Sequence, residues 1–171
     1  IYAYLNEMED LEKGIDAFAD LPDAKLDMLC EIINEVVIKN NKKLIVFALF
    51  RKTLEYLKIR LNINGHKCIL IHGGVSNKID KHVGSDISDR TKKLLEFKEN
   101  KDINILLSSE VGREGLDMQF CDALVNYDLP WNPMVVEQRI GRIDRFGQQS
   151  EKVNIYNLVI KDSIQEVIYV R

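Results

Sequence analysis

Apolar side chains follow two alternating patterns from residue 23 to the end of the chain. One pattern places them every three or four residues, which predicts amphipathic helices at about 23–39, 53–61, 88–100 and 133–145, and a short terminal helix. The other is a continuous apolar run of strand length, which is typical of a strand covered on both faces of a parallel sheet. These runs predict strands in "LIVFAL", "KCILIHGG", "INILLSS", "ALVNYDL" and "VNIYNLVI".

Strands that alternate with helices predict an α/β fold with right-handed crossovers and a doubly wound, mostly parallel sheet flanked by helices. The chain has 171 residues, 46% of them apolar, which is enough for one well-formed core. Residues 1–22 differ from the rest, because acidic residues dominate them and their apolar positions are irregular. We interpret 1–22 as a connector or a solvated helix, and 23–171 as one domain.

Composition limits the possible functions. A formal net charge of -3 and a sequence pI near 5.7 argue against a protein that holds nucleic acid by overall charge, so any such contact must be local. The sequence has no apolar window of about 18 residues and no charged-then-apolar leader, so we expect no membrane span and a cytoplasmic location. Cys30, Cys68 and Cys121 lie far apart, which favours buried, reduced thiols over a disulfide framework or a zinc site.

Polar and glycine-rich segments follow three of the predicted strands. In doubly wound sheets, ligands gather at the carboxyl ends of the strands. The segments are "HGG" (72–74), "SSEVGREGLD" (108–117) and "DLPWN" (128–132). Their glycines could let the backbone approach a phosphate, and the carboxylate of Asp117 could accept from a ribose hydroxyl, although tight turns explain the glycines equally well.

The last predicted helix carries a row of cations. Asn132 is a suitable N-cap and Pro133 a suitable first residue for it. Helical spacing would then project three side chains together, with Arg139 beside them: Gln138, Arg142 and Arg145. A guanidinium group matches phosphate oxygens bidentately, and Gly141 in a helix interior suggests close approach of another surface. The alternative is a row of solvated arginines paired with Asp144 or Glu137.

Several common motifs are absent from the sequence. It contains no G-x-x-x-x-G-K-[ST] loop to hold the β- and γ-phosphates, and no dinucleotide fingerprint, so a self-contained Rossmann-type enzyme is disfavoured. Asp128 ends an apolar strand as a magnesium-binding aspartate would, but that interpretation is weak without a phosphate loop in the same domain. We predict no metal site in the chain itself.

The order of the segments resembles the second RecA-like lobe of superfamily two helicases, and most closely the Swi/Snf type. The resemblance covers about 23–171 and rests on "LIVFALFRKTLEYL", "IHGG", "DRTKKLLEFKEN", "ILLSSEVGREGLD", "LVNYDLPWNP" and "EQRIGRIDRFGQ". The last two blocks are the specific part, and their form is similar to the bacterial RapA-like branch. The sequence departs from eukaryotic remodellers at Asp144, where they have histidine, and at Arg113, where they have glycine. The polar connection 75–88 is also longer than usual.

The resemblance implies a role for each matching position. Arg142 and Arg145 match arginine fingers, and Gln138 matches a glutamine near the γ-phosphate. The other matches are to positions that meet nucleotide (Gly115, Asp117), face nucleic-acid backbone (Ser109, Arg113, His72, Gly73, Gly74) or couple the nucleic-acid groove to the finger helix (Trp131, Asn132).

The resemblance also implies an activity. The chain would be the C-terminal lobe of an ATP-hydrolysing, helicase-like translocase on double-stranded DNA, with ATP and magnesium held mainly by an N-terminal lobe of the same protein. RNA polymerase or another protein would be a further candidate partner. The isolated lobe should then be catalytically silent. The alternative is a RecA-like module that binds nucleic acid or protein without hydrolysis.

Overall fold

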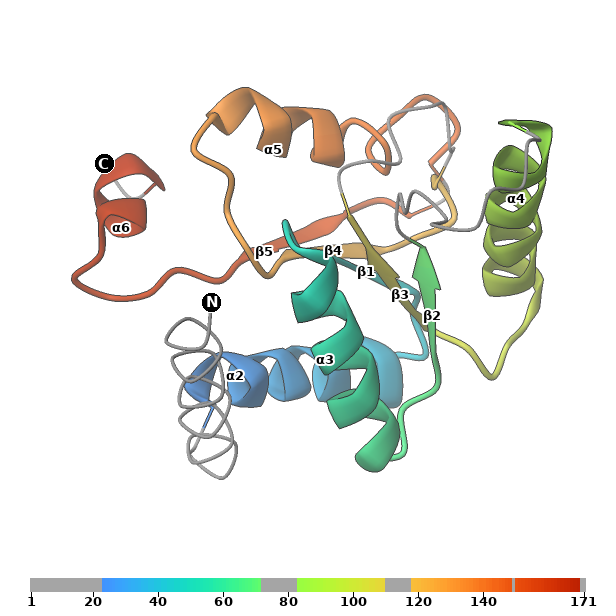
Figure 1. The fold of residues 1–171 in the computed structure, drawn as a ribbon, viewed down its shortest axis with the longest axis horizontal. Coiled ribbons are helices and arrows are strands. Elements are labelled where there is room, and N and C mark those ends of the chain that lie inside the picture. Colours follow the sequence, from blue (N-terminus) through green and yellow to red (C-terminus); the bar gives the residue numbers. More distant parts are fainter. Residues whose placement is uncertain (1–22, 72–82, 110–117, 149, 170–171) are drawn as a thin grey trace, which may run out of the picture.

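The computed structural model describes residues 23–71, 83–109, 118–148 and 150–169. They form a five-stranded sheet in the order β2-β3-β1-β4-β5, and every pairing is parallel (Figure 1). The strands are β1 (Leu44–Phe47), β2 (Cys68–Ile71), β3 (Ile105–Ser108), β4 (Ala123–Asn126) and β5 (Asn154–Asn157). The predicted α/β fold with a parallel sheet is therefore confirmed.

Helices connect the strands. They are α2 (Ala24–Ile33), which continues as a π-helical stretch η1 (Asn34–Lys39), then α3 (Arg51–Ile63), α4 (Val83–Glu99), α5 (Pro133–Ile140) and α6 (Ile164–Tyr169). The helix expected at 88–100 begins earlier than predicted, so Ser88 lies inside α4 and is not its N-cap. The sequence did not reveal this start, because the residues before Ser88 are polar and show no apolar periodicity. Polar residues can still form a helix, since each costs it only a few tenths of a kcal/mol.

The sheet separates two apolar cores. Alternate strand residues such as Val46 and Leu107 face α2, η1 and α3 on one side. The intervening residues, such as Ile45 and Leu106, face Phe97 of α4 and the chain around Ile143 on the other. The central strands β1, β3 and β4 are buried throughout, which explains their continuous apolar sequence.

The N-terminus of α2 is capped by Asp23. Its carboxylate accepts hydrogen bonds from the amides of Lys25 (3.1 Å) and Leu26 (2.9 Å), and from the Tyr56 hydroxyl of α3 (2.9 Å). One side chain thus caps the start of α2 and joins that helix to α3.

Replacing Asp23 by alanine should therefore lower the free energy of unfolding by about 1 kcal/mol, because two amides at the helix start lose their acceptor. Urea denaturation followed by circular dichroism would measure the change. Glu31→Ala, an exposed acid of the same helix, serves as the control and should have little effect. Equal losses for the two variants would contradict the capping role.

The three cysteines are free. Cys121 is buried, and Cys30 and Cys68 are partly buried. Burial raises the pKa of each of the three thiols, so they stay protonated at neutral pH. Within the described residues, no group of three or more His, Cys, Asp or Glu side chains could hold a metal ion, and no helix is long and apolar enough to cross a membrane.

Candidate functional site

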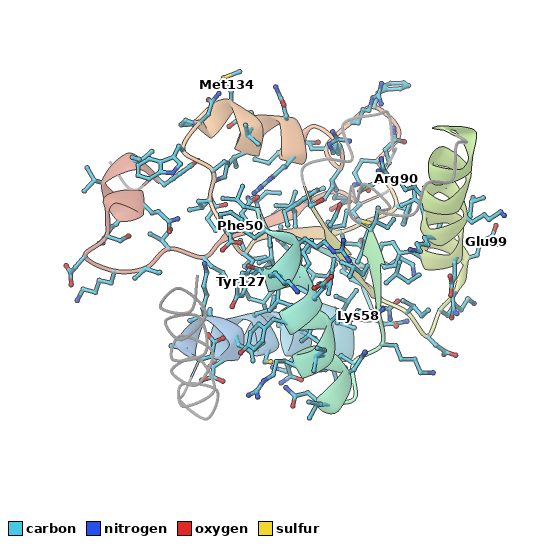
Figure 2. The ribbon with its side chains drawn as sticks, in the orientation of Figure 1. Phe50, Lys58, Arg90, Glu99, Tyr127 and Met134 are labelled. Carbon is cyan, nitrogen blue, oxygen red and sulfur yellow. The ribbon has the colours of Figure 1, made fainter. Side chains whose placement is uncertain are left out.

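The candidate site begins where β4 ends. The chain leaves β4 through "YDLPWN" and enters α5, which lies beside the carboxyl edge of the sheet (Figure 1). The Asn132 side chain accepts from the amide of Met134 (3.0 Å), and Pro133 occupies the first helical position, so the predicted start of this helix is confirmed. Met134 points outward from α5, away from the sheet (Figure 2).

The helix is shorter than predicted. It ends at Ile140, with Gly141 as its C-cap, and Gly141 to Gln148 form a series of turns that we call the finger turn. Gly141 has a φ of -61°, and among the described residues a Cβ there would meet two carbonyls of its own helix, Glu137 at 3.4 Å and Gln138 at 3.9 Å. Gly141 therefore ends the helix and does not lie in its interior as expected. The close approach of another surface at Gly141 stays a prediction.

The finger turn is anchored at three points. Ile143 is fully buried in the apolar core that also contains Phe97 of α4. The carbonyl of Arg142 accepts a hydrogen bond from the amide of Met118 (3.2 Å). The Gln148 side chain donates from Nε2 to the carbonyls of Cys121 and Ile143, both at 3.0 Å. These contacts hold a segment that has no regular secondary structure of its own.

Gly147 is required by the shape of this turn. Its φ is +102°, and a Cβ there would lie 2.7 Å from the side-chain oxygen of Gln119. The backbone conformation strains any larger residue at this position, and the Gln119 side chain would also have to move. Neither Gly147 nor Gln148 was among the expected site residues, although the glycine is itself a signal for a tight turn.

The two arginines of the finger turn remain available for a ligand. Arg142 is partly exposed, and Arg145 is exposed together with Asp144 and Phe146. Neither arginine forms an ion pair with a carboxylate among the described residues, so the alternative of pairing with Asp144 or Glu137 is not what the structure shows. Gln138 is exposed on α5.

Arg139 lies in a different environment from Arg142 and Arg145. Only 2% of its surface is exposed, and its guanidinium donates from Nη1 to Asn126 Oδ1 (2.6 Å) and to the carbonyl of Asp128 (3.1 Å). The guanidinium also lies over the ring of Phe47, 5.1 Å from its centroid. The expectation that Arg139 flanks the other arginines on one helical face was wrong, because Arg139 faces the sheet and the other two follow the end of the helix.

Asp128 is bound within the protein. One carboxylate oxygen accepts from the Lys25 ammonium (3.1 Å) and the other from the amide of Leu49 (3.2 Å). The same ammonium lies 4.6 Å from the centre of the Tyr127 ring. These contacts give Asp128 a structural role in joining α2 to the sheet and leave little room for the weak magnesium interpretation.

Ser109 follows β3 at the same edge and is 5% exposed. Its hydroxyl is buried without a hydrogen-bond partner among the described residues, and its amide donates to the carbonyl of Ile71 (3.3 Å). Trp131 is 71% exposed. The remaining predicted site residues lie outside the described part of the chain: His72, Gly73, Gly74, Arg113, Gly115 and Asp117.

Comparison with known proteins gives a consistent result. Residues 24–147 match the family described as "Helicase conserved C-terminal domain". The chain is 39% identical over 134 residues to the uncharacterized ATP-dependent helicase YqhH of Bacillus subtilis, covering 78% of this chain and 22% of that protein. It is 33% identical over 148 residues to the RNA polymerase-associated protein RapA of Vibrio campbellii (85% and 14%), and 30% identical over 146 residues to the ATP-dependent helicase FUN30 of Saccharomyces cerevisiae (85% and 12%).

Solved structures support the same fold. The crystal structure of the C-terminal part of the Fun30 ATPase domain superimposes with a TM-score of 0.75 at 24% identity, covering 99% of this chain and 53% of that one. The C-terminal domain of the DEAD-box protein Dbp5 gives a TM-score of 0.62 at 26% identity, covering 84% and 74%. The chain spans less than a quarter of the curated relatives named above. The predicted resemblance to the second lobe of Swi/Snf-type helicases is confirmed, and the chain belongs to the helicase conserved C-terminal domain family.

Proposed function

We propose that this chain is the C-terminal motor lobe of an ATP-dependent translocase on double-stranded DNA, in which Arg142 and Arg145 act as arginine fingers. The observation that carries the proposal is the finger turn. It presents two guanidinium groups without carboxylate partners among the described residues, from a backbone anchored to Met118 and Cys121 ahead of β4 and by Ile143 in the core. The turn continues from α5, which follows β4, and in doubly wound sheets ligands bind in the region where the strands end.

The proposed chemistry is hydrolysis of ATP. Arg142 and Arg145 would hold the ATP phosphates, and magnesium would be held mainly by the N-terminal lobe. When bound, ATP supplies the γ-phosphoryl group that is transferred to water. The two guanidinium groups would donate to the phosphate oxygens and stabilise negative charge as the bond to the leaving group breaks.

Two exposed apolar side chains fit a lobe that closes against a partner surface. Phe50 follows β1 and Trp131 follows β4, and both are exposed. A partner lobe seated where these strands end would cover both side chains. The chain spans only part of the length of its relatives, which is compatible with an N-terminal lobe in a longer protein. Its similarity to the RNA polymerase-associated protein RapA makes RNA polymerase a further candidate partner.

The proposal is tested by comparing the full-length protein with the isolated chain. ATP hydrolysis would be measured for both, with duplex DNA, single-stranded DNA, RNA or no nucleic acid. We expect turnover only from the full-length protein, with duplex DNA as the strongest stimulator. Turnover by the isolated chain would contradict the division of the site between two lobes. No turnover by the full-length protein under any condition would favour a non-hydrolytic binding module instead.

A further inference from the structure

A buried charge beneath α5 is the least expected feature near the finger turn. Arg139 is almost fully buried, although removing a guanidinium from water costs several kcal/mol unless it is well satisfied. A buried apolar side chain would dock α5 on the sheet without that cost. An arginine at this position therefore calls for a reason beyond packing.

The contacts of Arg139 join it to the ends of two strands, β4 and β1. Asn126 at the end of β4 accepts at 2.6 Å, and its own amide nitrogen donates to Asn157 Oδ1 of β5 at 2.8 Å, which fixes the direction of the acceptor. The carbonyl of Asp128 is the second acceptor, and Phe47 of β1 lies against the guanidinium. Hydrogen bonds from a planar, charged fork are directional, so they hold α5 in one place and orientation where apolar contact alone would let it slide.

The same residue is joined to the finger turn through its backbone. The amide of Arg142 donates to the carbonyl of Arg139 (3.2 Å), and the carbonyl of Arg142 accepts from Met118 (3.2 Å). The backbone that carries the first finger is therefore held by two hydrogen bonds, one of which comes from the residue bound to the sheet. A movement of Arg139 would move Arg142, while Gln148 holds the far end of the turn.

We propose that Arg139 is a positioning residue, which sets the place of Arg142 and Arg145 relative to the sheet through its bonds to Asn126 and Asp128 and does not touch the nucleotide. This inference rests on the proposed function. Arg139, which lies close in sequence to Arg142 and Arg145, thus positions these two side chains.

The test uses the full-length protein at a temperature where every variant is folded. Arg139→Met keeps the length and apolar part of the side chain but removes its donors. We expect kcat for nucleic-acid-stimulated ATP hydrolysis to fall about 10- to 100-fold, because a displacement of about 1 Å can cost that much. KM for ATP should change less than about threefold, since the lost interaction acts in the transition state. Arg139→Lys retains the charge and hydrogen-bond donors but not the planar fork, and should lose less of kcat.

Two controls distinguish a positioning role of Arg139 from general destabilisation of the fold. Leu61→Ala weakens the opposite core at the end of α3 and should keep kcat although it lowers Tm. In the Arg142→Ala, Arg145→Ala double variant, adding Arg139→Met should lower kcat by less than about threefold, because the two side chains that Arg139 positions are already absent.

The possible failures can be told apart. Wild-type kcat in Arg142→Ala and Arg145→Ala would overturn the proposed function itself. Loss of kcat in those variants, with wild-type kcat in folded Arg139→Met, would overturn only the positioning role. An equal fall of kcat in Leu61→Ala would also overturn the positioning role, because the effect of Arg139 would then be general destabilisation. The same holds if Arg139→Met lowers kcat by its full 10- to 100-fold in the Arg142→Ala, Arg145→Ala background.

Discussion

Replacing Arg142 or Arg145 by alanine in the full-length protein is expected to lower nucleic-acid-stimulated ATP hydrolysis by about 10³- to 10⁵-fold, the usual contribution of an arginine finger. The effect should be in kcat, because charge on the phosphate oxygens develops most in the transition state. Both side chains reach solvent and neither pairs with a carboxylate among the described residues, so folding should be unaffected. A coupled assay of ATP turnover, with thermal unfolding alongside, would measure both quantities.

The matched control for these variants is Arg60→Ala. Arg60 is an exposed arginine on α3, and α3 covers the opposite face of the sheet from the finger turn. Its removal changes the net charge equally and should leave turnover intact. Arg142→Lys keeps the charge but not the planar fork, and should recover only part of the activity. Retained turnover in both alanine variants would refute the arginine-finger assignment.

The largest stability effect is expected at Phe97. Its ring is fully buried, lies 5.7 Å from the ring of Phe120, and supports the Lys43 ammonium at 4.7 Å from its centre. The same ammonium donates to the carbonyl of Phe97 in the last turns of α4 and to the carbonyls of Asn100 and Ile103, which follow the helix, and burial lowers the pKa of Lys43. Phe97→Ala should therefore cost about 3–5 kcal/mol of unfolding free energy, because it leaves a cavity and loosens the end of α4.

Urea denaturation would test this prediction, with Leu95→Ala as the control. Leu95 lies on the same helix but is 48% exposed, so its truncation should cost well under about 1 kcal/mol. A loss at Phe97 no larger than the loss at Leu95 would mean that α4 does not depend on this contact.

The fold was predictable because its signals are local and repeated. The strands β1, β3 and β4 are buried on both faces, so each appears as an unbroken apolar run, and the Asn132–Pro133 pair marks the start of α5 directly. Parallel pairing followed from the alternation of strands and helices. These features depend on neighbouring residues, which a single sequence displays.

The site was less predictable because it depends on contacts between distant residues. Spacing of three predicts one helical face for Arg139, Arg142 and Arg145, but only the tertiary contacts of Gln148 and Ile143 show that the helix stops before the last two. Burial of Arg139 depends on an acceptor, Asn126, that lies 13 residues earlier in the chain. The roles of the site residues in catalysis and nucleic-acid binding stay predictions.

The strand order has a consequence for how the chain is made. Of the strands that follow one another in sequence, β2 pairs with β3 and β4 pairs with β5, but β1 and β2 are separated by β3. During synthesis on the ribosome, β1 and β2 therefore emerge without their partner, and the sheet cannot assemble until β3 has been translated. Such non-local pairing slows folding and exposes apolar strands in the interval. A nascent chain of this family would accordingly benefit from chaperone protection until its second half has been released.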